Sequence, residues 1–164
     1  MNPLSSLPQA AAVGIGATVL MDLWLLALQR AGVPTLDFAM LGRWAGHLPR
    51  GRFAHDAIRR AEPVRGERAL GWLVHYAVGV VLAVLLVGLQ GASWLRAPTL
   101  SPALAWGLAT TAAPLFLLQP AMGAGMASSR TPAPLKNVLR SLANHGVFGL
   151  SLYLSALALA RWMD

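Results

Sequence analysis

The sequence has no cysteine and little charge. Without cysteine it can hold no disulfide, thiolate-bound metal, iron–sulfur cluster or cysteine nucleophile. Only 12% of the 164 residues are charged, whereas 56% are hydrophobic. A soluble domain usually carries about 25% charged residues. Because so few charges cannot cover a water-facing surface, the composition predicts a membrane protein.

Acidic residues are also scarce, with 6 Asp and Glu against 13 Lys and Arg and a formal net charge of +7. In a soluble protein this balance would suggest a nucleic-acid partner. Here the arginines are not interleaved with base-stacking aromatic residues, so we expect no nucleic acid. In a membrane protein the same balance is typical of basic cytoplasmic loops that face anionic lipid. We therefore expect the lipid bilayer and anionic headgroups as partners.

A secretory signal peptide is not expected at the N-terminus. Residues 1–21 contain no Lys or Arg, so the positive segment of a signal peptide is missing. The apolar stretch is also longer than the apolar core of a signal peptide. We expect this stretch to stay in the protein as a membrane span.

Long apolar stretches occur four times, at about residues 7–29, 69–90, 100–121 and 140–162. A helix needs about 20 residues to cross the hydrocarbon core. Spanning segments must pair their own backbone groups, and the alternation of a β-barrel is absent. The sequence therefore predicts a single all-α membrane domain with four transmembrane helices in a bundle. Pro114 predicts a kink in the third helix.

The connections between these stretches differ in charge. The loops at 31–68 and 122–140 are basic, whereas 91–99 carries only Arg96. The positive-inside rule places the two basic loops in the cytoplasm. Both termini then face the periplasmic side of a bacterial inner membrane.

The loop at 31–68 is predicted to contain short amphipathic helices at the membrane interface. Apolar residues recur at helical spacing in 36–48, with Asp37 as a cap, and again in 53–61. His47 and His55 are expected to face lipid or solvent, with the alternative that either folds back over the polar residues of the spans. The basic residues expected to contact lipid headgroups or anions are Arg50, Arg52, Arg59, Arg60 and, in the third connection, Arg130.

Ionisable residues inside the predicted spans are the main functional signal, because they are costly in a bilayer. Three occur: Asp22, His75 and His145. Each follows a stripe of small or polar residues at i, i+4 spacing, which favours close helix packing toward the interior. At about 1.5 Å per residue, the histidines lie about 6 Å inside the cytoplasmic end of their spans and Asp22 about 10 Å. The residues expected to bind a ligand or proton are Asp22, His75, His145, Gln119, Asn144, Thr18 and Tyr76.

Several chemistries fit this set of residues. Asp22, His75 and His145 would form a two-histidine, one-carboxylate metal site, and the two histidines alone would suit a haem. Without metal, the same groups would relay protons or bind a small solute. They would otherwise only hydrogen-bond the helices together. The absence of an E-x-x-H pair on one helix disfavours metal.

We interpret the chain as having a cytoplasm-facing intramembrane site for a small molecule, a proton or an ion, related to transport. A membrane-embedded metalloprotein, haem protein or enzyme is the alternative, and a structural or assembly protein is the third. The cofactor is unknown, and we favour a binding protein over an enzyme. Glycines on the helices offer surfaces for association, which is compatible with a homo-oligomer.

Five motifs resemble those of a known family. They are Gly16–Trp24, Gly42–His47, Gly66–Tyr76, Gln119–Met126 and Ser141–Gly149. Together they are similar to a bacterial family of small inner-membrane proteins known only as domain of unknown function 2938. The resemblance implies a four-span membrane fold and brings no activity. The motifs contain Asp22, His75, Gln119 and His145.

Overall fold

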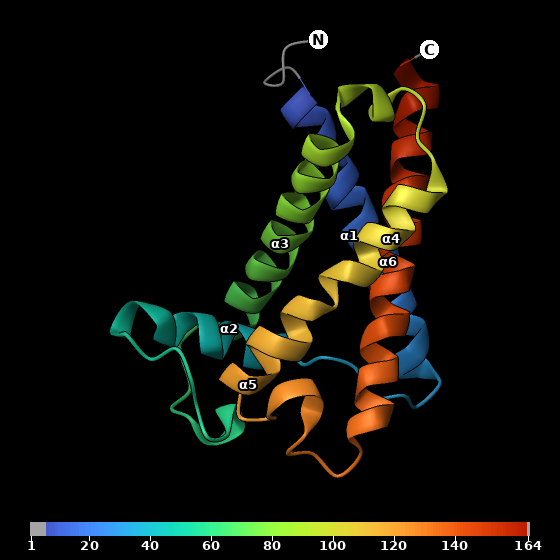
Figure 1. Ribbon diagram of the computed structural model, residues 1–164. Coiled ribbons are helices and arrows are strands. Elements are labelled where there is room, and N and C mark those ends of the chain that lie inside the picture. Colours follow the sequence, from blue (N-terminus) through green and yellow to red (C-terminus); the bar gives the residue numbers. More distant parts are fainter. Residues whose placement is uncertain (1–5, 164) are drawn as a thin grey trace. The chain divides into compact units, whose positions relative to one another are not determined.

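The computed structural model describes residues 6–163, which form helices and turns without any strand (Figure 1). Four helical segments are long and apolar enough to cross a membrane. The all-α prediction with four such segments is therefore confirmed. The segments are α1 (Leu7–Arg30), α3 (Glu67–Gln90), Leu100–Ala121, and α6 (Pro134–Met163).

The segment Leu100–Ala121 is not one continuous α-helix. It consists of α4 (Leu100–Thr110), a π-helical turn (Pro114–Leu118) and α5 (Gln119–Ala121). Proline has no N–H to donate, and the next donor, Leu115, bonds to the carbonyl of Thr111 at 3.2 Å. The structure thus has a local change of helix type at Pro114, and the kink expected there stays a prediction.

The last helix begins at Pro134, six residues before the predicted start at 140. Proline is well tolerated in the first turn of a helix, because the backbone N–H groups there have no acceptor within the helix. The first turn is closed by the N–H of Asn137, which donates to the carbonyl of Ala133 at 3.1 Å. Lys136 and Arg140 consequently lie on a helix rather than in a loop.

The chain divides into two compact units, which we describe separately. The first unit comprises the residues up to Thr35, Tyr76–Thr110, and the residues from Asn144 onward. The second comprises Leu36–His75 and Thr111–Ala143.

The first unit has an apolar core to which α1, α3, α4 and α6 all contribute. Its buried residues are mostly small or aliphatic: Ala10, Val13, Ala17, Ala83, Leu86, Val87, Trp94, Leu95, Ala103, Phe148, Leu152 and Ala156. A Cβ at Gly14 would lie 2.7 Å from the Cα of Val80, and one at Gly107 would lie 2.6 Å from the Cα of Gly149. The predicted small-residue stripes therefore do bring helices into close contact.

The start of α1 and the end of α6 lie at the same end of the first unit. The Gln9 side-chain amide donates to the sulfur of Met163 at 3.4 Å. An even number of membrane crossings requires this arrangement, since both ends of the chain then emerge on one side.

The second unit contains α2 (Phe38–His47), which is one of the predicted amphipathic helices. Asp37 caps it, because its carboxylate accepts from the N–H of Ala39 at 2.9 Å. The second predicted helix, at 53–61, is extended apart from a 3-10 turn at Ile58–Arg60. Its backbone bonds elsewhere: the N–H of His55 donates to the Ala121 carbonyl at 2.8 Å and that of Ile58 to Met122 at 3.0 Å.

Helix α2 packs closely on the first turns of α3. A Cβ at Gly42 would collide with the carbonyl oxygen of Glu67, and one at Gly71 with that of Phe38. The Phe38 ring lies 4.3 Å from the Trp72 ring and 4.6 Å from the His75 ring, measured between centroids. The two glycines therefore allow α2 to lie directly on the α3 backbone.

We predict that Gly42→Ala and Gly71→Ala each lower the thermal unfolding temperature of the purified protein. The added methyl group meets backbone atoms, and overpacking typically costs about 1–3 kcal/mol. Gly88→Ala is the matched control, because a Cβ there meets nothing within 4 Å. That control should be neutral or stabilising by about 0.5–1 kcal/mol, the usual helix preference for alanine. Equal melting temperatures for all three variants would contradict the packing described here.

Candidate functional site

Asp22 and Tyr76 form a hydrogen bond within the first unit. The phenol of Tyr76, on α3, donates to Oδ2 of Asp22, on α1, at 2.8 Å. Both side chains are half-buried. In this contact the phenol is the donor and the carboxylate oxygen is the acceptor. Two of the predicted site residues are thus brought together.

Thr18 lies one helical turn before Asp22 and is buried. Its hydroxyl donates to the carbonyl of Gly14, on its own helix, at 2.8 Å. The same oxygen lies against Gly79, where any Cβ would collide with it. Thr18 therefore serves the contact between α1 and α3, and its role in binding a ligand stays a prediction.

His145 is held by Thr110 within the first unit. The Thr110 hydroxyl oxygen lies 2.7 Å from the Gly107 carbonyl and 2.9 Å from Nδ1 of His145. A carbonyl can only accept, so the hydroxyl hydrogen points to Gly107 and Nδ1 of His145 must be the donor toward Thr110. In neutral His145 the lone pair is then on Nε2. This atom can accept a proton or a ligand hydrogen bond.

Asn144 is also oriented by a neighbouring helix. Its side-chain oxygen accepts from the indole N–H of Trp24 at 3.0 Å. Trp24 ends one of the recognised motifs, yet the sequence did not indicate that it positions Asn144. The amide NH₂ is the donor side of Asn144, so this residue and His145 offer both kinds of hydrogen-bonding group.

The other predicted residues lie in the second unit. His75 packs against Phe38, and the Gln119 side-chain oxygen accepts from the hydroxyl of Ser128 at 2.9 Å. Across residues 6–163, no three His, Asp or Glu side chains are grouped so that they could hold a metal ion. Because Asp22 and His145 belong to one unit and His75 to the other, the predicted three-residue metal site stays a prediction.

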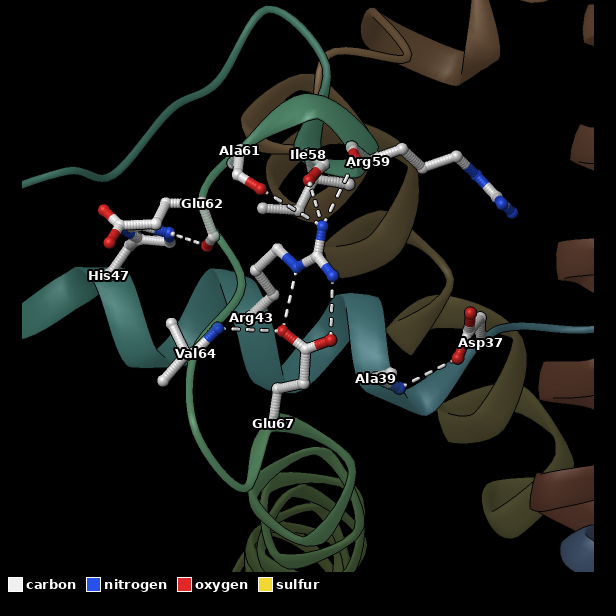
Figure 2. Close-up of polar contacts among 10 residues, drawn as sticks. All are labelled: Asp37, Ala39, Arg43, His47, Ile58, Arg59, Ala61, Glu62, Val64 and Glu67. Carbon is white, nitrogen blue, oxygen red and sulfur yellow. Dashed lines mark hydrogen bonds and ion pairs between the residues drawn. The ribbon is translucent and has the colours of Figure 1, made fainter.

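Arg43 and Glu67 form an ion pair in the second unit that the sequence did not reveal (Figure 2). Nε and Nη2 of Arg43 donate to the two carboxylate oxygens of Glu67, each at 2.8 Å. Nη1 lies 3.2 Å from each of the carbonyl oxygens of Arg59 and Ala61. Glu67 in turn accepts from the N–H of Val64 at 3.0 Å. The ion pair thus links α2, the turn at 58–61 and the start of α3.

The surroundings of Arg43 keep it charged. The hydrogen bonds that Arg43 donates to Glu67 raise the pKa of Arg43, against the opposing effect of its burial. Both residues lie in or at the end of the basic 31–68 loop. Their place in the recognised motifs could have pointed to them. Arg43 lies in the motif Gly42–His47, and Glu67 lies in the motif Gly66–Tyr76.

His47 and His55 are buried in the second unit, with exposed fractions of 0% and 9%. The prediction that they face lipid or solvent is therefore wrong. Their ring centroids are 5.0 Å apart, and the ring planes are inclined by 60°. Burial, followed by the charges of His47 and Arg52, lowers the pKa of His55. His55 is consequently neutral at physiological pH.

The five arginines predicted to contact lipid headgroups all have exposed side chains. They are Arg50, Arg52, Arg59, Arg60 and Arg130. Among them only Arg59 takes part in the Arg43 contacts described above, and it does so through its backbone carbonyl.

Residues 11–159 match the model of a family described as a protein of unknown function, DUF2938. This match covers well over half of the chain. The chain belongs to this family. No curated protein and no solved structure matches it. The family membership suggested by the five motifs is thus confirmed, and any activity has to be argued from the residues themselves.

We predict that Arg43→Lys lowers the unfolding temperature although it keeps the charge. Lysine cannot bond both oxygens of Glu67 and the carbonyls of 58–61 together. Removing one partner of a buried ion pair costs about 3–5 kcal/mol, and the conservative change should cost part of that. Arg50→Lys, at an exposed arginine in the same loop, is the control and should be silent. Thermal unfolding in detergent measures both, and a silent Arg43→Lys would show that the ion pair contributes little.

Proposed function

We propose that this chain is a multi-pass protein of the bacterial inner membrane that binds a proton or a small cation at Asp22, with access from the cytoplasm. The observation that carries the proposal is the hydrogen bond between Tyr76 and Asp22, which joins two of the candidate membrane-spanning helices. Four such helices and the family match support the membrane assignment.

A carboxylate in an apolar helix favours the binding of a proton or a small cation on electrostatic grounds. An ionised group taken out of water loses several kcal/mol of solvation unless it is paired. The Tyr76 phenol donates to the carboxylate of Asp22 and is itself neutral, so this bond supplies no positive charge. A bound proton or cation would neutralise the carboxylate. The carboxylate therefore acts as the binding group and the phenol as the group that positions it.

His145 and Asn144 would extend this site with neutral polar groups. The hydrogen bond of His145 with Thr110 and that of Asn144 with Trp24 fix their orientation in the first unit, which also holds Asp22. The Nε2 atom of His145 accepts protons in its neutral form. These residues would relay a proton or orient a small polar solute.

The basic loop would face anionic lipid on the cytoplasmic side. Phe53, which is 66% exposed, directly follows the exposed Arg52 in this loop. Exposed apolar side chains beside arginines are typical of segments that lie in the headgroup region. This arrangement supports the orientation expected from the charges of the loops.

We predict that a membrane-soluble carbodiimide modifies Asp22 in proteoliposomes. Such reagents attack protonated carboxyl groups in apolar surroundings, so labelling should fall as the pH rises. Asp22→Asn should remove the label, and Tyr76→Phe should increase labelling because the phenol no longer occupies a carboxylate oxygen. Mass spectrometry of the intact protein reads out the result.

Added salts then separate a proton site from a cation site. Protection of Asp22 by Na⁺ or K⁺ at constant pH and ionic strength would indicate a cation, and pH dependence alone would indicate a proton. An Asp22 that is never labelled, or that is labelled equally at every pH, would contradict the proposal.

The absence of cysteine allows the orientation to be tested directly. We predict that a membrane-impermeant thiol reagent applied to spheroplasts labels the Ser93→Cys variant, since the connection after α3 faces outward. The Arg59→Cys variant should be labelled only after the membrane is permeabilised. Both positions are exposed in the protein, so a difference in labelling reports the side of the membrane and not burial. The opposite pattern would show that the chain is inserted the other way round.

A further inference from the structure

His47 and His55 come from neighbouring stretches of the second unit. His47 is the last residue of α2, and His55 lies in the extended segment that follows. Both are at least nine-tenths buried. The two buried imidazoles lie side by side, and among the described residues no carboxylate pairs with them. Their ring nitrogens indicate which kind of ligand the pair is suited to bind.

The hydrogen bond of His47 fixes which nitrogen carries the hydrogen. Nε2 lies 3.0 Å from the carbonyl oxygen of Glu62 (Figure 2). Because a carbonyl can only accept, Nε2 must be the N–H donor. The lone pair of neutral His47 is then on Nδ1, which is buried and has no hydrogen-bond partner among residues 6–163. Histidines that bind metals show this pattern, with one nitrogen donating to a carbonyl and the other free to coordinate.

His55 offers a second lone pair next to the first. Both ring nitrogens are buried, and neither has a hydrogen-bond partner in the part of the chain that the structure describes. A buried polar atom without a partner costs about 1–3 kcal/mol, so a ligand that used one of these nitrogens would recover part of that. The backbone of His55 is held firmly, because its N–H donates to Ala121 and its carbonyl lies against Gly123.

The spacing of the rings suits a shared ion. The ring centroids of His47 and His55 are 5.0 Å apart. Two imidazoles bound to one tetrahedral ion at about 2.0–2.1 Å have ring centres about 5 Å apart. Imidazole nitrogen is a preferred ligand of zinc, copper and nickel and a poor one for magnesium or calcium.

We propose that His47 and His55 form a two-imidazole binding site for a divalent transition-metal ion of the zinc, copper and nickel group. No third His, Asp or Glu joins them among the described residues, so water would fill the remaining positions. The site lies in the second unit and uses neither Asp22 nor Tyr76. It is therefore independent of the function proposed above.

The test uses the full chain, purified without a histidine tag and titrated with Cu²⁺. We expect about one equivalent to bind, and its electron paramagnetic resonance spectrum should show coupling to two imidazole nitrogens. His47→Gln and His55→Gln should each weaken binding at least tenfold. His75→Gln is the matched control and should bind Cu²⁺ like the wild type.

A second measurement uses the wild-type protein and therefore does not depend on whether the variants fold. Zn²⁺ should raise the unfolding temperature of the wild-type protein, because an ion that binds only the folded state stabilises it. The proposal is overturned if the wild type binds neither ion stoichiometrically. It is also overturned if binding survives in the His47→Gln, His55→Gln double variant or is lost in His75→Gln.

Discussion

The guanidinium of Arg43 provides the contacts on which the second unit depends. A guanidinium has five N–H donors in a rigid fork, and here they serve the Glu67 carboxylate and the carbonyls near the 58–61 turn. That stretch forms only one 3-10 turn, so much of its backbone has no helical partner. Arg43 takes the place of the hydrogen bonds that a helix would have made. The same stretch carries Glu62, whose carbonyl orients His47, so the histidine pair depends on this network as well.

The first unit is organised by close backbone contact rather than by charge. Gly14 and Gly79 allow α1 and α3 to approach so closely that a single methyl group would not fit between them. This approach brings the Tyr76 phenol within hydrogen-bond distance of Asp22. Where α4 and α6 meet, Gly107 and Gly149 have the same role beside the pair of Thr110 and His145. The small residues that pack the helices thus also set the distances between the polar groups.

The sequence indicated those features that a bilayer imposes on every segment. Spans and small-residue stripes follow from length, hydropathy and the need to pair the backbone, and all of these are local. The burial of His47 and His55 was missed because it depends on bonds from 55–58 to Ala121 and Met122, far away in the chain. The same holds for Arg43, whose partner Glu67 lies 24 residues further on. A pattern within one loop cannot show which distant carbonyl or carboxylate its residues will meet.

The two proposed sites would select different cations, although both present electron-pair donors in a chain of net positive charge. Asp22 offers a charged oxygen, which suits a proton or a small hard cation and gains from neutralisation in an apolar helix. His47 and His55 offer neutral nitrogens, which bind transition metals through covalent character and gain little from an alkali ion. Charge alone would not separate these ligands, but the donor atoms do. Since each site lies within one unit, each can be occupied without requiring the other.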